Sequence, residues 1–233
     1  MQIKREKRNI IRIISFTLIL TLIFYFIGIY VGFKIFEFFY TKELIEKINY
    51  LYFQTKSLNE EINSYKEIIF LDFLDKKTKC KLLENIINKV RDYSFNVIAK
   101  SLPYRVEEYE FESKLSDEYL KLKSEYMKMM STSYFLTIKY KKECDTNIST
   151  LLYFYSSFCG ADCINQGEEL DKLREYNIDS YFFIIDKDWN LNEIKILNEL
   201  FEINSVPSIV INEKYVLRGF SNVSTILSYF KKG

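Results

Sequence analysis

An uninterrupted apolar segment near the N-terminus constrains this chain more than any other feature. No side chain between Arg12 and Lys34 is charged, and residues 13–33 are mostly Ile, Leu, Phe, Tyr and Val. A helix of this length rises about 31 Å, enough to cross a hydrocarbon core of roughly 30 Å. A cleaved signal peptide has a shorter apolar core, of about 7 to 15 residues, and a small-residue cleavage site. We therefore expect residues 13–33 to be a retained transmembrane helix in a lipid bilayer.

Basic residues flank this segment on one side. Five Lys or Arg side chains precede it, at positions 4, 5, 7, 8 and 12, whereas the residues after it mix Lys34 and Lys42 with Glu37 and Glu43. Because the cytoplasmic flank of a membrane helix carries the excess of basic residues, residues 1–12 are predicted to be a cytoplasmic tail. The rest of this single-pass protein then lies on the extracytoplasmic side of the cell membrane.

Two glycines at the end of the span have a spacing found in helix dimers. Gly28 and Gly32 form a G-x-x-x-G motif, which allows two membrane helices to approach closely. The motif is short, so both a homodimer through these glycines and an unpaired helix are open interpretations.

The composition excludes several kinds of site. The 233 residues include no histidine, which removes Ser-His, Cys-His and histidine-metal centres, and we expect no metal site or other cofactor. The net charge of +1 arises from the basic tail, so the remainder lacks the basic surface of a nucleic-acid-binding protein. All four cysteines follow the apolar segment, where an oxidising compartment would permit disulfides.

Residues 34–146 have the pattern of a helical spacer. Three stretches carry apolar side chains at helical spacing, at about residues 40–69, 77–100 and 116–140. Pro103 is expected to end the second stretch, and Ser116 to cap the third. The stripes fit a coiled coil with a second chain or helix packing within one chain. The second interpretation is favoured, because such stripes more often build a core than an interface.

Two cysteines lie at matching places in this spacer. Cys80 is near the start of the second stretch, and Cys144 follows the third. An antiparallel hairpin of these stretches, with its midpoint near residue 112, would bring both to the same end. We expect a structural disulfide that closes the base of the hairpin, with two buried unreactive thiols as the alternative.

From residue 147 to 233 the periodicity alternates between strand and helix. Strands are expected at residues 150–156, 179–185, 208–211 and 215–217, and helices at residues 164–176, 192–202 and 223–230. The order βαβαββα predicts an α/β domain with a central mixed sheet and helices on both faces.

Two motifs fall at defined places in this order. The sequence F-C-G-A-D-C lies between the first strand and the first helix, and a Val-Pro pair precedes the third strand. With these placements, about the last 85 residues resemble the thioredoxin-like superfamily. The resemblance implies a nucleophilic thiol at Cys159, a resolving thiol at Cys163 and a cis proline at Pro207 that holds substrate peptides. Gly219 is similar to the glycine that follows the last strand in this superfamily.

The motif also departs from the superfamily. Gly160, Ala161 and Asp162 separate the cysteines, where two residues are usual, and the preceding strand has no carboxylate to exchange protons with the second thiol. If both cysteines lie on the first helical turns, their Cα atoms are about 6 Å apart, a separation that a disulfide can span. The helix dipole would favour the thiolate of Cys159, and Asp162 would partly oppose this effect.

These features lead to three functional hypotheses. The first is a membrane-anchored thiol-disulfide oxidoreductase for extracytoplasmic protein thiols, in which Cys159 attacks, Cys163 resolves and Pro207 positions the substrate backbone. The second is a non-catalytic thioredoxin-like interaction module, in which the same cysteines form a structural disulfide. The third is a Cu(I) chaperone similar to the Sco-type proteins, although those add a histidine ligand that this chain lacks.

Overall fold

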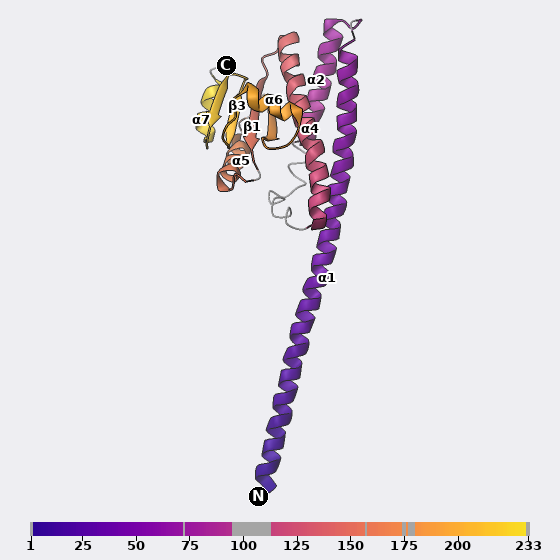
Figure 1. Cartoon of the computed structure of the whole chain (residues 1–233), viewed down its shortest axis with the longest axis vertical. Helices are drawn as coiled ribbons and strands as arrows, with labels where there is room; N and C mark the ends of the chain where they lie inside the picture. The colour runs from indigo at the N-terminus through magenta and orange to yellow at the C-terminus, as the bar shows by residue number, and fades with distance from the viewer. Residues whose placement is uncertain are drawn as a thin grey trace. The chain divides into compact units, whose positions relative to one another are not determined.

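The computed structural model describes residues 2–71, 73–94, 113–156, 158–173, 176 and 180–231. The chain divides into two units, Met1–Lys47 and Ile48–Gly233. Helix α1 (Gln2–Ile69) contributes to both and is coloured indigo to purple in Figure 1. The stretch from residue 40, expected as a helix of its own, is therefore part of α1.

The first unit contains an apolar helical segment. Within the part of the chain that the structure describes, Ser15–Phe36 is the segment long and apolar enough to cross a membrane, with a mean hydropathy of 2.2 and none of it buried. Its side chains include large apolar residues that are about half or more exposed, such as Phe24 and Phe26. A helix of this kind is compatible with a single-pass membrane anchor and with a signal sequence.

In the second unit, the end of α1 packs against α2 (Lys76–Tyr93) and α4 (Ser113–Glu143). The apolar stripe of α1 is buried in the chain itself, at Ile48, Leu51, Leu58, Ile62 and Ile69. The Tyr93 hydroxyl of α2 donates to the Leu51 carbonyl of α1 at 3.2 Å, and the Asn59 amide of α1 donates to the Glu125 carbonyl of α4 at 2.8 Å. The stripe thus serves helix packing within one chain.

The boundaries of α2 and α4 have local causes. Asp75 caps α2, because its carboxylate accepts from the backbone N–H of Thr78 at 2.8 Å, a hydrogen bond that also lowers the pKa of Asp75. Helix α4 begins at Ser113, so the prediction that Ser116 caps it is wrong, and Ser116 lies inside the helix. Pro103 lies outside the described residues.

The rest of the second unit is built on a mixed four-stranded sheet in the order β2-β1-β3-β4. Its strands are β1 (Ser149–Tyr155), β2 (Ser180–Asp186), β3 (Ser208–Ile211) and β4 (Tyr215–Arg218). Strand β1 pairs in parallel with β2 and antiparallel with β3, and β3 pairs antiparallel with β4. The helices of this part are α5 (Ala161–Leu173), α6 (Asn192–Leu200) and α7 (Val223–Phe230).

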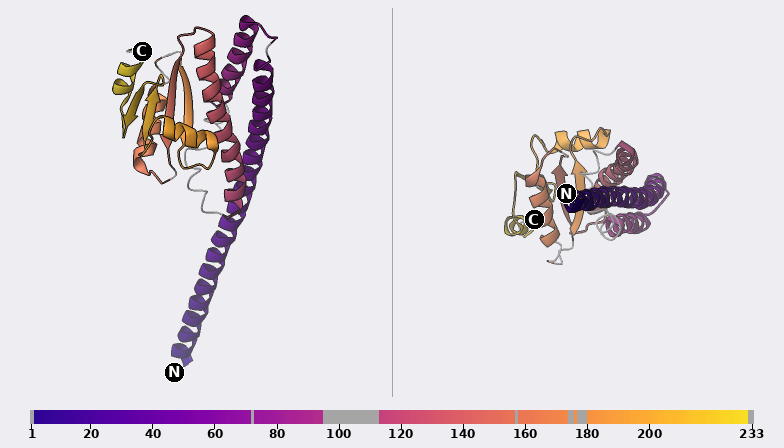
Figure 2. Two further views of the ribbon diagram at one scale, coloured as in Figure 1. Left: turned by 45° about the horizontal axis from the view of Figure 1, so that its top comes forward. Right: turned by 90° about the horizontal axis from the view of Figure 1, so that it is seen from below.

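Helices cover both faces of the sheet, as Figure 2 shows. Alternate β1 side chains point to opposite faces: Leu152 and Phe154 join the core with α4 and α6, whereas Leu151 and Tyr153 join the core with α5 and α7. Phe154 is fully buried, which stabilises the fold by about 1.5 to 3 kcal/mol. Both ends of β1 are therefore held from two sides.

Helix α4 belongs to the core of the sheet. Its Tyr134 ring packs edge-on against Phe183 of β2 at 5.4 Å and against Phe201, which follows α6, at 6.2 Å between ring centroids. Burial raises the pKa of Tyr134. The sequence pattern indicated a spacer here, and it did not indicate that one helix of this spacer covers a face of the sheet.

Candidate functional site

The motif cysteines are joined by a disulfide at the carboxyl end of β1. The Cα atoms of Cys159 and Cys163 are 5.6 Å apart. Cys163 lies in the first turn of α5, whereas Cys159 precedes the helix by two residues, so the expectation that both lie on helical turns is wrong for Cys159. Gly160 between them has a φ of +64°, which glycine adopts at no steric cost. The Cys159 N–H donates to the Ser156 carbonyl at 3.0 Å, which closes the loop.

Pro207 lies at the same end of the sheet. Strands β1 and β3 are antiparallel with Phe154 opposite Ser208, so the residue before Ser208 lies beside the end of β1. The Val206–Pro207 peptide bond is cis, and Pro207 is buried. The Gly219 N–H donates to the Pro207 carbonyl at 2.8 Å. The sheet thus places the two motif segments next to each other.

Tyr153 of β1 reaches the helix that carries Cys163. Its side chain is buried, and its hydroxyl donates to the Cys163 carbonyl at 3.0 Å. Its ring stacks on that of Tyr155 with 6.2 Å between centroids. The alternation of β1 indicates that Tyr153 is buried, but no sequence signal indicates the partner of its hydroxyl. The strand before the motif therefore contributes a phenol where the resemblance would place a carboxylate.

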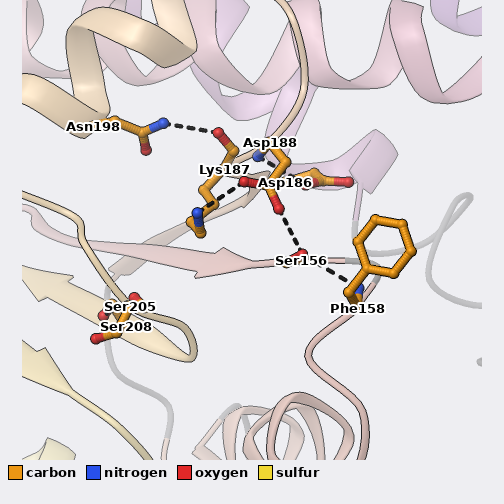
Figure 3. A network of polar contacts seen from close by, with 8 residues as sticks. All are labelled: Ser156, Phe158, Asp186, Lys187, Asp188, Asn198, Ser205 and Ser208. Carbon is orange, nitrogen blue, oxygen red and sulfur yellow. Dashed lines mark hydrogen bonds and ion pairs between the residues drawn. The ribbon is translucent and has the colours of Figure 1, made fainter.

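A chain of hydrogen bonds holds the loop in front of Cys159, as Figure 3 shows. The Ser156 hydroxyl donates to the Asp188 carboxylate at 2.7 Å and accepts from the Phe158 N–H at 3.2 Å. The Asp188 N–H donates to the Asp186 carboxylate at 3.1 Å. Hydrogen bonds from the Lys187 ammonium and from Ser156 lower the pKa of Asp188, so Asp188 is ionised at neutral pH.

Asp186 also forms an ion pair that is almost completely buried. The Lys123 ammonium of α4 lies 2.8 Å from the Asp186 carboxylate, and both side chains are 4% exposed. The ring centroids of Tyr119, Tyr155 and Trp189 lie 5.9, 5.7 and 5.2 Å from the Lys123 nitrogen, close enough for cation–π attraction. Sequence reasoning missed this pair, because a charged residue on a helix is usually solvated.

The helix that carries Cys163 is anchored on its other side. The buried Gln166 of α5 donates to the Ser221 carbonyl at 3.0 Å, and its own carbonyl accepts from the Ser221 N–H at 2.7 Å. The Glu169 carboxylate accepts from the Val223 N–H at the start of α7 at 2.8 Å. These bonds fix α5 against α7, so Cys163 lies on a rigid element.

Exposed apolar side chains adjoin the residues of the site. Phe158, directly before Cys159, is 94% exposed, while Ile164 and Phe220 are each 52% exposed. Ile164 follows Cys163, and Phe220 follows Gly219. The disulfide is thus surrounded by surface that can contact apolar groups.

The other two cysteines form a second disulfide in the helical part of the unit. Cys80 in α2 is joined to Cys144, which follows α4, with 5.7 Å between their Cα atoms. Lys76 and Asp145 form an exposed ion pair of 2.9 Å beside it. The described ranges contain no group of three or more His, Cys, Asp or Glu side chains that could hold a metal ion. A Cu(I) site would have to use the two thiolates of one cysteine pair alone.

Comparisons with known proteins identify no family for this chain. No family model and no curated protein matches it. Among solved structures it is similar to thioredoxin-2, a component of the malaria parasite protein secretion machinery, with 28% identity over 38% of this chain and 85% of that chain and a TM-score of 0.31. It is also similar to chloroplastic thioredoxin z, with 19% identity over 41% of this chain and 86% of that chain and a TM-score of 0.33.

A third similar structure is the germline-specific thioredoxin Deadhead from Drosophila melanogaster. The identity is 21% over 42% of this chain and 92% of that chain, with a TM-score of 0.31. The fold rests on the geometry itself: a mixed four-stranded sheet with helices on both faces, a cysteine pair after β1 and a cis proline before β3. These features together define a thioredoxin-like fold.

Proposed function

We propose that this protein is a membrane-anchored thiol-disulfide oxidoreductase that acts on protein thiols outside the cytoplasm. The observation that carries the proposal is the Cys159–Cys163 disulfide at the carboxyl end of β1, with Pro207 at the same end of the sheet. Cys159 lies in a loop and is partly exposed, so another thiolate can approach its sulfur. Accessible disulfides have higher reduction potentials than relaxed structural ones, and they exchange more readily.

The reaction begins when a substrate thiolate attacks the Sγ atom of Cys159. The Cys159–Cys163 bond breaks, Cys163 leaves as a thiolate and takes up a proton, and a mixed disulfide joins Cys159 to the substrate. A second substrate thiolate attacks the substrate sulfur of this bond and releases Cys159. The substrate has then lost two electrons and two protons, which the cysteine pair has gained. Exchange in the opposite direction retraces these steps, and a partner disulfide or dithiol protein restores the pair.

The local structure supports separate roles for the two cysteines. Cys159 precedes the N-terminus of α5, where the free N–H groups and the helix dipole favour a thiolate. The exposed Asp162 carboxylate in the first turn opposes part of this effect. Cys163 lies within the helix, and its carbonyl accepts from Tyr153. Cys159 is therefore the group proposed to bond to substrates, and Cys163 the group that releases them.

The surroundings of the pair favour a polypeptide substrate. The exposed Phe158, Ile164 and Phe220 side chains offer apolar surface around the disulfide. Pro207 would position the substrate backbone beside Cys159, as the resemblance to thioredoxin-like proteins implies. The apolar segment Ser15–Phe36 would anchor the protein in the bilayer, with the basic residues before it in the cytoplasm.

The proposal is tested by trapping mixed disulfides in the full-length protein. Without the resolving thiol, Cys163→Ser should retain substrates on Cys159, whereas the matched variant Cys159→Ser should retain none. Adducts are detected as bands that disappear on reduction and are identified by peptide mass spectrometry. The proposal fails if Cys163→Ser carries no adducts and the wild-type pair has a reduction potential below about −300 mV, the range of structural disulfides.

One observation favours a second candidate, a non-catalytic interaction module. Strand β1 consists of Ser, Thr, Leu, Tyr and Phe, so it offers no carboxylate beside Cys163. In this candidate the Cys159–Cys163 bond only staples the loop to α5, and the exposed apolar side chains bind a partner. The trapping experiment separates the two candidates, because a staple forms no mixed disulfides.

A further inference from the structure

We infer that Lys123 of α4 is a positioning residue for the redox loop, which makes the helical region a working part of the site. This inference rests on the proposed function, and it concerns how the loop before Cys159 is held. It starts from the buried ion pair between Lys123 and Asp186, whose atoms are 2.8 Å apart. The two residues are 63 positions apart and come from α4 and the end of β2.

A buried ion pair needs a reason beyond stability. Removing two charges from water costs about as much as their attraction returns, so apolar side chains of similar volume would hold α4 against the sheet equally well. What apolar side chains cannot do is fix a carboxylate in one orientation. The ammonium of Lys123 binds one oxygen of Asp186, and the other oxygen accepts from the Asp188 N–H at 3.1 Å. The pair therefore orients the turn after β2.

The orientation is passed on to the loop that carries Cys159. The Asp188 side chain accepts from the Ser156 hydroxyl at 2.7 Å, and Ser156 accepts from the Phe158 N–H at 3.2 Å, as Figure 3 shows. Phe158 is covalently joined to Cys159, whose own N–H donates to the Ser156 carbonyl. An unbroken series of polar contacts thus leads from Lys123 to the backbone of the redox loop.

The turn after β2 has further supports that keep this series in place. The Asn198 amide of α6 donates to the Lys187 carbonyl at 2.8 Å, and the Lys187 N–H donates to the Tyr155 carbonyl at 2.9 Å. The Asp186 N–H lies 3.2 Å from the Met127 sulfur of α4. Since α4 contributes both Lys123 and Met127, the position of α4 sets the position of Asp186.

A held loop favours the closed disulfide. With the loop ordered, the Cys159 thiol stays near Cys163, which raises its effective concentration and shifts the equilibrium with glutathione toward the disulfide. When the link to α4 is cut, the loop samples more conformations and the dithiol gains. The test is therefore an equilibrium constant and not a melting temperature.

The test uses the full-length protein in detergent, equilibrated with reduced and oxidised glutathione, with the state of Cys159 and Cys163 read by alkylation and peptide mass spectrometry. Lys123→Met/Asp186→Asn removes both charges together, so no unpaired charge is left buried. We expect an equilibrium constant shifted toward the dithiol by about tenfold, which for two electrons is roughly 30 mV. Ser156→Ala, a loop substitution with little effect on the core, should shift it in the same direction.

The decisive measurement combines the substitutions. If Lys123 acts through Ser156, the triple variant should shift the constant no further than the larger of the two separate effects. The matched control is Lys141→Met/Glu213→Gln, which removes another α4 ion pair, of 2.7 Å, at the opposite end of β1, and it should leave the constant unchanged. Constants within twofold of wild type in both test variants, or fully additive shifts, would overturn the inference. Failure of substrate trapping alone would not affect it, because glutathione measures the pair without any protein substrate.

Discussion

The hydroxyl of Tyr153 donates a 3.0 Å hydrogen bond to the backbone carbonyl of Cys163. Tyr153 is on β1 and Cys163 is on α5, so one buried bond connects the strand before the motif to the helix after it. The bond locates the resolving cysteine relative to the sheet without touching its sulfur. It also shows that the strand side chain nearest to Cys163 is held by the backbone.

We predict that Tyr153→Phe lowers the free energy of unfolding by about 1 kcal/mol, because a buried hydrogen bond is lost while the ring remains. The measurement is a urea titration of the full-length protein in detergent with both disulfides oxidised. Tyr215→Phe is the matched control, since it removes a hydroxyl from a half-buried tyrosine on the edge strand β4. An equal loss in both variants would show that the bond to Cys163 contributes nothing specific.

The two disulfides should differ in their contribution to stability. Cys80 and Cys144 are 64 residues apart, and closing a loop of that length stabilises by about 4 kcal/mol in the chain-entropy model. Cys159 and Cys163 are 4 residues apart, for which the same model gives about 2 kcal/mol. Cys80→Ser/Cys144→Ser should therefore unfold at lower urea than Cys159→Ser/Cys163→Ser. Peptide mapping of the unreduced protein should find no link between the two pairs, and such a link would contradict the hairpin arrangement.

Pro207→Ala should reduce the yield of mixed disulfides trapped by Cys163→Ser. Pro207 is buried at the end of the sheet beside the motif, and its carbonyl accepts from Gly219. Alanine adds an N–H group and frees φ, so the backbone beside Cys159 is less well defined. Pro103→Ala changes the other proline of the chain and should leave the yield as it is. If the two variants trap equally, Pro207 has no part in substrate binding.

The proposed topology predicts which cysteines are accessible from outside the cell. In a variant that retains Cys159 alone, a membrane-impermeant thiol label should react in intact cells, because the basic residues before the apolar segment hold the N-terminus inside. Gln2→Cys in a background without other cysteines is the control and should react only after lysis. The reverse pattern would place the cysteine pair in the cytoplasm and remove the basis for its proposed role.

Much of the sheet region could be predicted because its residues alternate. Strand β3 and helix α7 occupy the expected residues, since apolar runs with clear flanking turns define them. Helix α5 begins at Ala161, three residues before the expected start, and ends at Leu173. The positive φ of Gly160 allows the chain to turn sharply into the helix, and hydrophobic periodicity does not report such a turn.

The contacts between distant segments could not be predicted in the same way. The stripe of α4 indicates a helix with one apolar face, but not that this face meets β2 and α6. Lys123 and Asp186 have ordinary charged side chains in the sequence, and only the fold removes both from water. The motif identified the cysteines and Pro207 because these residues carry chemistry that is recognisable by type and spacing. The groups that hold them, Tyr153, Ser156 and Asp188, have no such signature.

Trp189 is the single tryptophan of the chain, and its ring lies 5.2 Å from the ammonium of Lys123. The protein thus carries one indole chromophore, placed between the accessory helix and the turn that leads to the redox loop. Its fluorescence reports on that junction alone, without a label and without interference from a second indole. Separation of α4 from the sheet and rearrangement at the cysteine pair can therefore be followed optically in the same sample, in detergent or in membranes.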